Sequence, residues 1–161
     1  MILDLQSMFS GTVAADGTKT AQAITATAIS TNVIDTRSVS GLPASADLGA
    51  GGGMGQLYLV VQTIQAFNTL TSLTITLESD SAVGLGSAPV VHFSTGAIAL
   101  AALTANTILA RVTLPSADYK RYLGLRYTVT GTNPTQGSIL AYLTFDVNRN
   151  VIYPGAFTVD A

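Results

Sequence analysis

The alternation of apolar and polar residues constrains the fold of this chain more than any other feature. In residues 72–79 it places Leu73, Ile75 and Leu77 on one side and polar residues on the other. Successive side chains of a β-strand point to opposite faces, whereas a helix face recurs roughly every 3.6 residues. The pattern therefore predicts a half-buried strand.

Three further stretches alternate in the same way. Their apolar positions, which we expect to face a core, are Ile108, Ala110, Val112 and Leu114 in residues 107–114, Leu123, Leu125, Tyr127 and Val129 in residues 122–130, and Ile139, Ala141, Leu143, Phe145 and Val147 in residues 138–147. Residues 56–65 are apolar on both faces, as is typical of a strand covered on both sides. Weaker patterns predict strands over 23–33 and 90–93, and residues 96–104 fit a helical turn or a strand equally well.

Glycine and proline separate these stretches, and no long amphipathic helix lies between them. Turn-forming residues gather at 41–43, 49–55, 84–86 and 131–134. Many strands without crossover helices form an antiparallel sandwich or barrel. The sequence thus predicts an all-β protein, an antiparallel jelly-roll-like β-sandwich of about eight strands.

The two ends of the chain fit this sandwich less well. Either end packs on its own domain, or it is an arm that lies on a neighbour. We expect a β-sandwich domain over residues 21–147, an N-terminal arm or extension over 1–20 and a C-terminal extension over 148–161.

The composition excludes several kinds of chemistry. The chain has 7 Lys+Arg against 9 Asp+Glu, one His and no Cys. Nucleic-acid binding needs an excess of cations, and a Cys/His zinc site needs four ligands. No apolar run approaches the roughly 20 residues of a membrane-spanning helix. We therefore expect no cofactor, no direct nucleic-acid partner and no membrane partner.

The small number of charged residues also indicates that the protein has partners. Charged residues make up 10% of the chain, against about 25% in an ordinary soluble domain. Charge keeps free monomers apart, so a chain with so little of it is expected to have much of its exterior covered by neighbours.

Four features could carry chemistry, and each has a simpler interpretation. His92 has no nucleophile motif around it, so we interpret it as a strand histidine with local hydrogen bonds. Glu78 and Asp80 resemble a glycosidase pair or part of a calcium loop, but a solvated strand end explains them better. The glycines of 49–55 lack the Lys-Ser/Thr of a phosphate loop. The cations of 120–127 are expected to pair with acidic groups of a neighbour, and we predict no enzymatic activity.

An ordered set of segments carries a family resemblance. They are Met1-Ile2-Leu3-Asp4 through Phe9-Ser10, residues 21–35, Asp47-Leu48-Gly49, residues 57–62, 71–77 and 98–104, and Lys120-Arg121-Tyr122-Leu123-Gly124-Leu125-Arg126-Tyr127. This set, which covers most of residues 1–147, resembles the jelly-roll cement (decoration) proteins of tailed bacteriophages, a family known from a Bordetella phage.

The resemblance implies a jelly-roll fold, self-association, and binding to the outer surface of a capsid built from a major capsid protein. The protein would be made in the host cytoplasm and end in the virion, as a homo-oligomer for which a dimer is favoured over a trimer. The contact residues that we expect are Ile2, Leu3, Met8, Phe9, Arg37, Arg126, Tyr153 and Phe157. The alternative is a non-enzymatic β-sandwich module that binds carbohydrate or a host surface, although such modules usually present Trp, which is absent.

If the terminal aromatic residues are arm contacts, replacing Phe9 and Phe157 by Ser leaves the fold intact and weakens association. If the double variant assembles as well as the wild type, the arm hypothesis fails.

Overall fold

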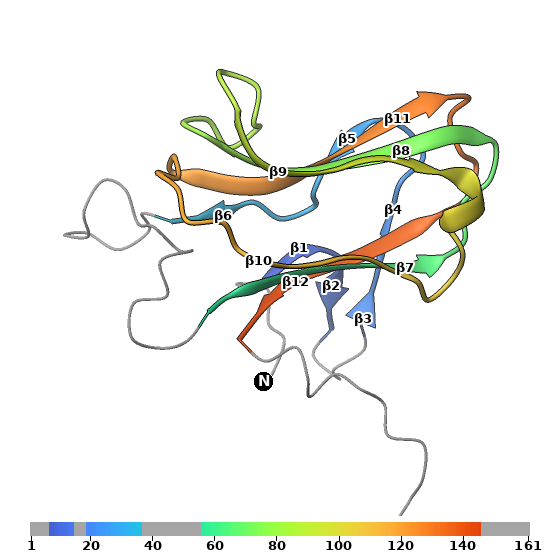
Figure 1. Cartoon of the computed structure of the whole chain (residues 1–161), viewed down its shortest axis with the longest axis horizontal. Coiled ribbons are helices and arrows are strands. Elements are labelled where there is room, and N and C mark those ends of the chain that lie inside the picture. Colours follow the sequence, from blue (N-terminus) through green and yellow to red (C-terminus); the bar gives the residue numbers. More distant parts are fainter. Residues whose placement is uncertain (1–6, 15–18, 37–55, 146–161) are drawn as a thin grey trace, which may run out of the picture.

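A computed structural model of the chain describes residues 7–14, 19–36 and 56–145. Within these ranges almost all regular structure is β (Figure 1). The elements are β1 (Met8–Ser10), β2 (Thr12–Val13), β3 (Lys19–Thr20), β4 (Gln22–Ala23), β5 (Ala28–Ile29), β6 (Ile34–Asp35), β7 (Tyr58–Gln65), β8 (Leu70–Asp80), β9 (Val90–Ala99), the 3-10 helix η1 (Leu100–Ala102), β10 (Ile108–Thr113), β11 (Tyr122–Gly131) and β12 (Ser138–Thr144).

Two antiparallel sheets lie face to face as the layers of a sandwich (Figure 1). The first sheet has the order β1-β12-β7-β10, and β4 also pairs with β12. The second sheet has the order β5-β11-β8-β9, and β6 also pairs with β11. The short strands β2 and β3 pair with each other in a separate two-stranded sheet.

The path of the chain is that of a jelly roll. Strands β1 and β4 share the position beside β12, and β5 and β6 share the position beside β11, which leaves four strand positions in each sheet. Between consecutive positions the chain crosses to the other sheet at every step except from β8 to β9. The predicted jelly-roll-like sandwich is confirmed.

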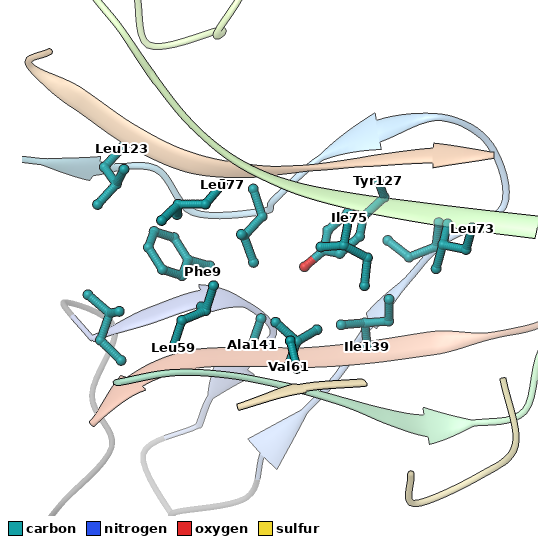
Figure 2. Close-up of a cluster of buried hydrophobic side chains, with 14 of the residues drawn as sticks. Phe9, Leu59, Val61, Leu73, Ile75, Leu77, Leu123, Tyr127, Ile139 and Ala141 are labelled. Carbon is teal, nitrogen blue, oxygen red and sulfur yellow. The ribbon is translucent and has the colours of Figure 1, made fainter. Parts of the chain in front are cut away.

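The alternating residues meet between the sheets. Leu73, Ile75 and Leu77 of β8 are completely buried and face Leu59 and Val61 of β7 across the core (Figure 2). Burying one such side chain contributes about 1.5–3 kcal/mol, so this interior dominates the stability of the fold.

A smaller cluster covers the outer face of the first sheet. Met8, Val60, Leu140 and Tyr142 are buried there, and Ala21 packs against them. This second layer explains why β7 is apolar on both faces, as the sequence predicted, and why β12 is buried along its whole length after Ser138.

The weaker strand predictions need correction. The strand expected over 23–33 is broken into β4 and β5, because the chain crosses between the sheets there. The amide of Gln22 holds this corner: its Oε1 accepts from Thr31 N at 2.8 Å and its Nε2 donates to Ile29 O at 2.9 Å. Strand β9 continues past residue 93 to Ala99, and η1 follows, so residues 96–104 contain both candidate structures.

Two expected core residues lie at the surface. A register shift between Ile108 and Ala110 marks a β-bulge, and Ile108 is exposed. Strand β12 ends at Thr144, so Phe145 also projects outward. Val147 lies outside the described residues.

Strand β1 belongs to the sandwich, although residues 1–20 were expected to form an arm or extension. It pairs with β12, and Asn32 ties it down by donating from Nδ2 to Met8 O at 2.7 Å and from its backbone N to Phe9 O at 2.8 Å. Phe9 points into the main core and Met8 into the outer cluster, and both are completely buried. Neither is available to a neighbour, which corrects their assignment as contact residues.

A buried hydroxyl pair also joins β1 to the opposite sheet. Ser10 Oγ and Tyr127 Oη lie 2.6 Å apart. Burial raises the pKa of Tyr127, and the bond to Ser10 opposes that rise only in part. The Tyr127 hydroxyl thus stays protonated and has the partner that a buried polar group requires.

Candidate interaction surface

The loop between β8 and β9, residues 81–89, folds onto the outer face of the second sheet and stands at the upper left in Figure 1. Its Leu85 is completely buried. A Cβ placed on Gly124 of β11 would lie 2.9 Å from Leu85 Cδ1 and 3.2 Å from Val33 Cγ2. Leu85 therefore packs where β11 has no side chain, and Gly124 provides the space.

An ion pair beside Leu85 fixes the loop to the sheet. Arg126 Nε donates to Glu78 Oε2 at 2.9 Å, and Arg126 Nη2 donates to the backbone oxygen of Leu85 at 2.5 Å. The other oxygen of Glu78, Oε1, accepts from Thr76 Oγ1 at 2.7 Å. Arg126 was expected to pair with an acid of a neighbour, but it pairs with Glu78 of its own chain.

The carboxylate of Asp80 holds the base of the loop. Oδ1 accepts from Ser81 N at 2.6 Å, Oδ2 accepts from Ser87 N at 2.8 Å, and Ala88 N lies 3.2 Å from each oxygen. Burial alone would raise the pKa of Asp80, but the backbone N–H donors outweigh it and lower that pKa below its usual value. Charge-assisted bonds of this kind are stronger than neutral ones, so one side chain orders both ends of the loop.

The interpretation of Glu78 and Asp80 as a solvated strand end is therefore wrong. Glu78 is 4% exposed and Asp80 is 0% exposed. Their oxygens are occupied by Arg126, Thr76 and loop amides. In the described ranges no group of three or more His, Asp or Glu residues could hold a metal ion.

Acid should loosen this loop, and the effect should depend on Asp80. Because the folded pKa lies below the unfolded value of about 3.9, Asp80 stabilises the fold above about pH 4 and loses that contribution as the pH falls through its folded pKa. Asp80→Asn is expected to lower stability at neutral pH and to flatten the acid dependence below about pH 5. Urea unfolding between about pH 3 and 7 measures both effects.

The exposed Asp118 provides the control. Asp118→Asn should lower stability at neutral pH by much less than Asp80→Asn does. The assigned role of Asp80 would be contradicted if the stability of Asp80→Asn fell with decreasing pH as steeply as that of the wild type.

His92 has the local hydrogen bond that its interpretation requires. Its Nε2 lies 2.7 Å from Ser79 Oγ, and its ring packs against Tyr119 with 4.4 Å between centroids. Burial lowers the pKa of His92 and so favours the neutral ring. Ser79 is completely buried and also accepts from Lys120 N at 3.0 Å. A catalytic pair needs an accessible nucleophile and an orienting acid, and among the described residues no carboxylate is bonded to His92.

The basic stretch 120–127 is also engaged within its own chain. Arg121 forms an ion pair with Asp35 at 2.9 Å, and its guanidinium lies 4.9 Å from the centre of the Tyr122 ring. Lys120 Nζ donates to the backbone oxygen of Ala88, at the end of the loop. Together with Arg126, these cations stabilise the fold and the loop instead of forming a basic face.

One valine of the loop and two valines at the start of β9 are exposed. Val83, Val90 and Val91 are 60%, 42% and 54% exposed, and residues 81–91 contain no charged side chain. From the sequence, Gly84-Leu85-Gly86 is expected only to form a turn. The apolar Leu85 between two glycines was the signal that this turn is anchored to the sheet.

The remaining predicted contact residues lie outside the described residues. They are Ile2, Leu3, Arg37, Tyr153 and Phe157. The glycine-rich segment 49–55 lies outside them as well. The structure leaves these hypotheses as they stood.

Comparison with known proteins gives one family. A family model described as Bbp16 matches residues 18–159, and its name suggests a Bordetella phage protein. No curated protein matches the sequence. Within the part of the chain that the structure describes, no helix is long and apolar enough to span a membrane.

Proposed function

Since this chain belongs to the Bbp16 family, we propose that it is a structural protein of a phage virion that binds the outer surface of the mature capsid. There it would cement neighbouring subunits of the major capsid protein. Membership in the Bbp16 family, whose name suggests a Bordetella phage protein, is the observation that carries this proposal. The role is non-catalytic, and self-association, with a dimer favoured over a trimer, remains an expectation from the resemblance.

The way the fold uses its few charges supports the proposal. Glu78 and Asp80 are buried in the fold, while Arg121 and Arg126 form ion pairs within the chain. Glu78 and Asp80 thereby leave the surface with fewer charges, while the Arg121–Asp35 pair stays partly exposed, at 47% and 27%. Such a surface suits a protein that works against neighbours and does not have to stay apart from them.

Binding to the assembled shell stabilises it by mass action. A protein that binds the assembled shell, and not its separated subunits, stabilises the shell by RT ln(1 + [L]/Kd) at each site. Contacts repeated by symmetry add avidity, because a copy bound at one point is held near the next.

Co-sedimentation with phage heads tests the proposal. Purified protein is added to heads stripped of it, before and after capsid expansion. We expect saturable binding to expanded heads at a fixed ratio to the major capsid protein. Absence of binding to both forms would overturn the proposal, and a glycan array would then test the carbohydrate-binding alternative.

A further inference from the structure

We propose that His92, Ser79 and Lys120 form a pH-sensitive clasp, which holds the connection between β10 and β11 against β8 and β9 at neutral pH and opens when the His92 ring is protonated. The clasp consists of the Ser79 hydroxyl, the His92 ring and the backbone N–H of Lys120. The inference is independent of the proposed function, because it concerns a conformational change within one chain.

A β-bulge aims the His92 ring at Ser79. In the register of β8 and β9, the partners of two consecutive β8 residues are Phe93 and Val91, so His92 is the extra residue of the bulged strand. Bulges re-aim side chains in this way. Nε2 of the ring lies 2.7 Å from Ser79 Oγ. Because the ring is only partly buried, a proton can reach it from solvent.

The hydrogen bonds of Ser79 fix the direction of its bond to His92. Ser79 is completely buried, and its Oγ accepts from Lys120 N at 3.0 Å. Among the described residues, the acceptor for the hydroxyl hydrogen is His92 Nε2. Ser79 therefore donates to Nε2, which requires a neutral ring with its own hydrogen on Nδ1. Burial lowers the pKa of His92 and favours the same neutral form.

Protonation of His92 is incompatible with this arrangement. Both nitrogens of the charged ring are donors, so Nε2 can no longer accept from Ser79. The buried hydroxyl then has no acceptor among the described residues, and a buried polar group without its partner is costly. The conflict is relieved when the ring moves toward solvent. The ring then also leaves Tyr119, with which it is in contact at 4.4 Å between centroids.

Lys120 connects the clasp to the neighbouring loop. Its backbone N–H donates to Ser79, and its Nζ donates to the backbone oxygen of Ala88, close to the start of β9. Tyr119, the preceding residue, is completely buried beside the His92 ring. Release of the ring should therefore loosen the connection between β10 and β11 together with the end of the loop 81–89.

The other titratable groups on the elements packed against His92 do not change charge in the same range. They are Glu78 and Asp80 on β8 and Asp118, Tyr119, Lys120 and Arg121 on the connection, while residues 81–91 contribute none. Carboxylic acids titrate at about pH 4, and tyrosine, lysine and arginine at about pH 10 or above. His92 is the one histidine of the chain. A change between about pH 5 and 7 is thus assigned to it.

Amide exchange at Lys120 tests the inference. The protection factor corrects for the intrinsic effect of pH on exchange. For the Lys120 N–H of the wild type it should fall at least about tenfold from pH 7 to pH 5, because the bond that orients Ser79 is lost. In His92→Gln the amide oxygen can accept from Ser79 at any pH, so protection should not change over this range. NMR titration of the single histidine should give a midpoint below about 6.5, the value in an unfolded chain.

Two further variants keep the test decisive if glutamine does not fit the site. Ser79→Ala removes the bond to the neutral ring, so the histidine midpoint should rise toward about 6.5. Asp80→Asn removes a nearby carboxylate and should keep the change seen in the wild type. The inference is overturned by equal protection of the wild type at both pH values, by the same fall in His92→Gln, by an unchanged midpoint in Ser79→Ala, or by loss of the change in Asp80→Asn.

Discussion

Phe9→Ala is expected to destabilise the protein by about 3–5 kcal/mol, the usual cost of removing a buried aromatic ring. The ring is completely buried between the two sheets, and no other large side chain of β1 enters this core. Small domains are stable by only about 5–15 kcal/mol in total, so the variant should unfold at a much lower urea concentration. Urea unfolding followed by circular dichroism measures the change.

Phe145→Ala is the matched control, because the same ring is removed from a side chain that is 51% exposed. It should change stability by about 0.5 kcal/mol or less. Equal, small effects of the two substitutions would show that β1 is an arm. Phe9→Ser is expected to be at least as damaging, so the earlier expectation of an intact fold for the Phe9/Phe157 double variant no longer holds.

The alternation of apolar and polar residues identified the long strands, because the buried face of a strand can be recognised from residues that are close together in the sequence. One face of β8, β11 or β12 meets the core, so Leu73, Leu123 and Ile139 can be assigned from their neighbours in the sequence alone. The fold class could be predicted from the sequence, but the order of the strands within each sheet could not. It depends on pairings such as Tyr58 with Thr144, which are far apart in the chain.

Strand β1 could not be recognised from local pattern. It has three residues, and its partners are Asn32 and the distant strand β12. Apolar residues near a terminus fit an arm and a short edge strand equally well, since either buries them. The two are distinguished only by the edge of β12 with which β1 pairs, and the local sequence does not reveal that edge.

The buried carboxylates were misinterpreted for a related reason. Asp and Glu are almost never fully buried unless they are paired, so a surface position was the better expectation from the sequence. Glu78 is paired with Arg126, which follows 48 residues later, and Asp80 is satisfied by a loop that folds back on it. Neither partner is visible in the sequence before the fold brings it close.

Gly124→Ala should destabilise the protein by about 1–3 kcal/mol, the usual cost of overpacking a filled site. The added Cβ would lie 2.9 Å from Leu85 Cδ1 and 3.2 Å from Ser30 Oγ. Since Ser30 Oγ also accepts the Leu125 N–H, it cannot move away freely. The Leu85 side chain must therefore give way, and the loop of residues 81–89 should lift from the sheet.

Leu85→Ala removes the opposing side chain and should itself cost about 2–3 kcal/mol, because a buried aliphatic contact is lost. In that background the Cβ of Gly124→Ala no longer meets Leu85 Cδ1. The cost of the double variant should therefore be smaller than the sum of the single costs, by about 1 kcal/mol or more. Urea unfolding of the four proteins gives this coupling energy.

The same variants test the anchor by amide exchange. If the loop is held by Leu85, then Leu85→Ala should speed amide exchange at Ser87 and Ala88, whose N–H groups donate to Asp80. Additive costs of Gly124→Ala and Leu85→Ala, with unchanged exchange at these amides, would mean that Leu85 does not hold the loop.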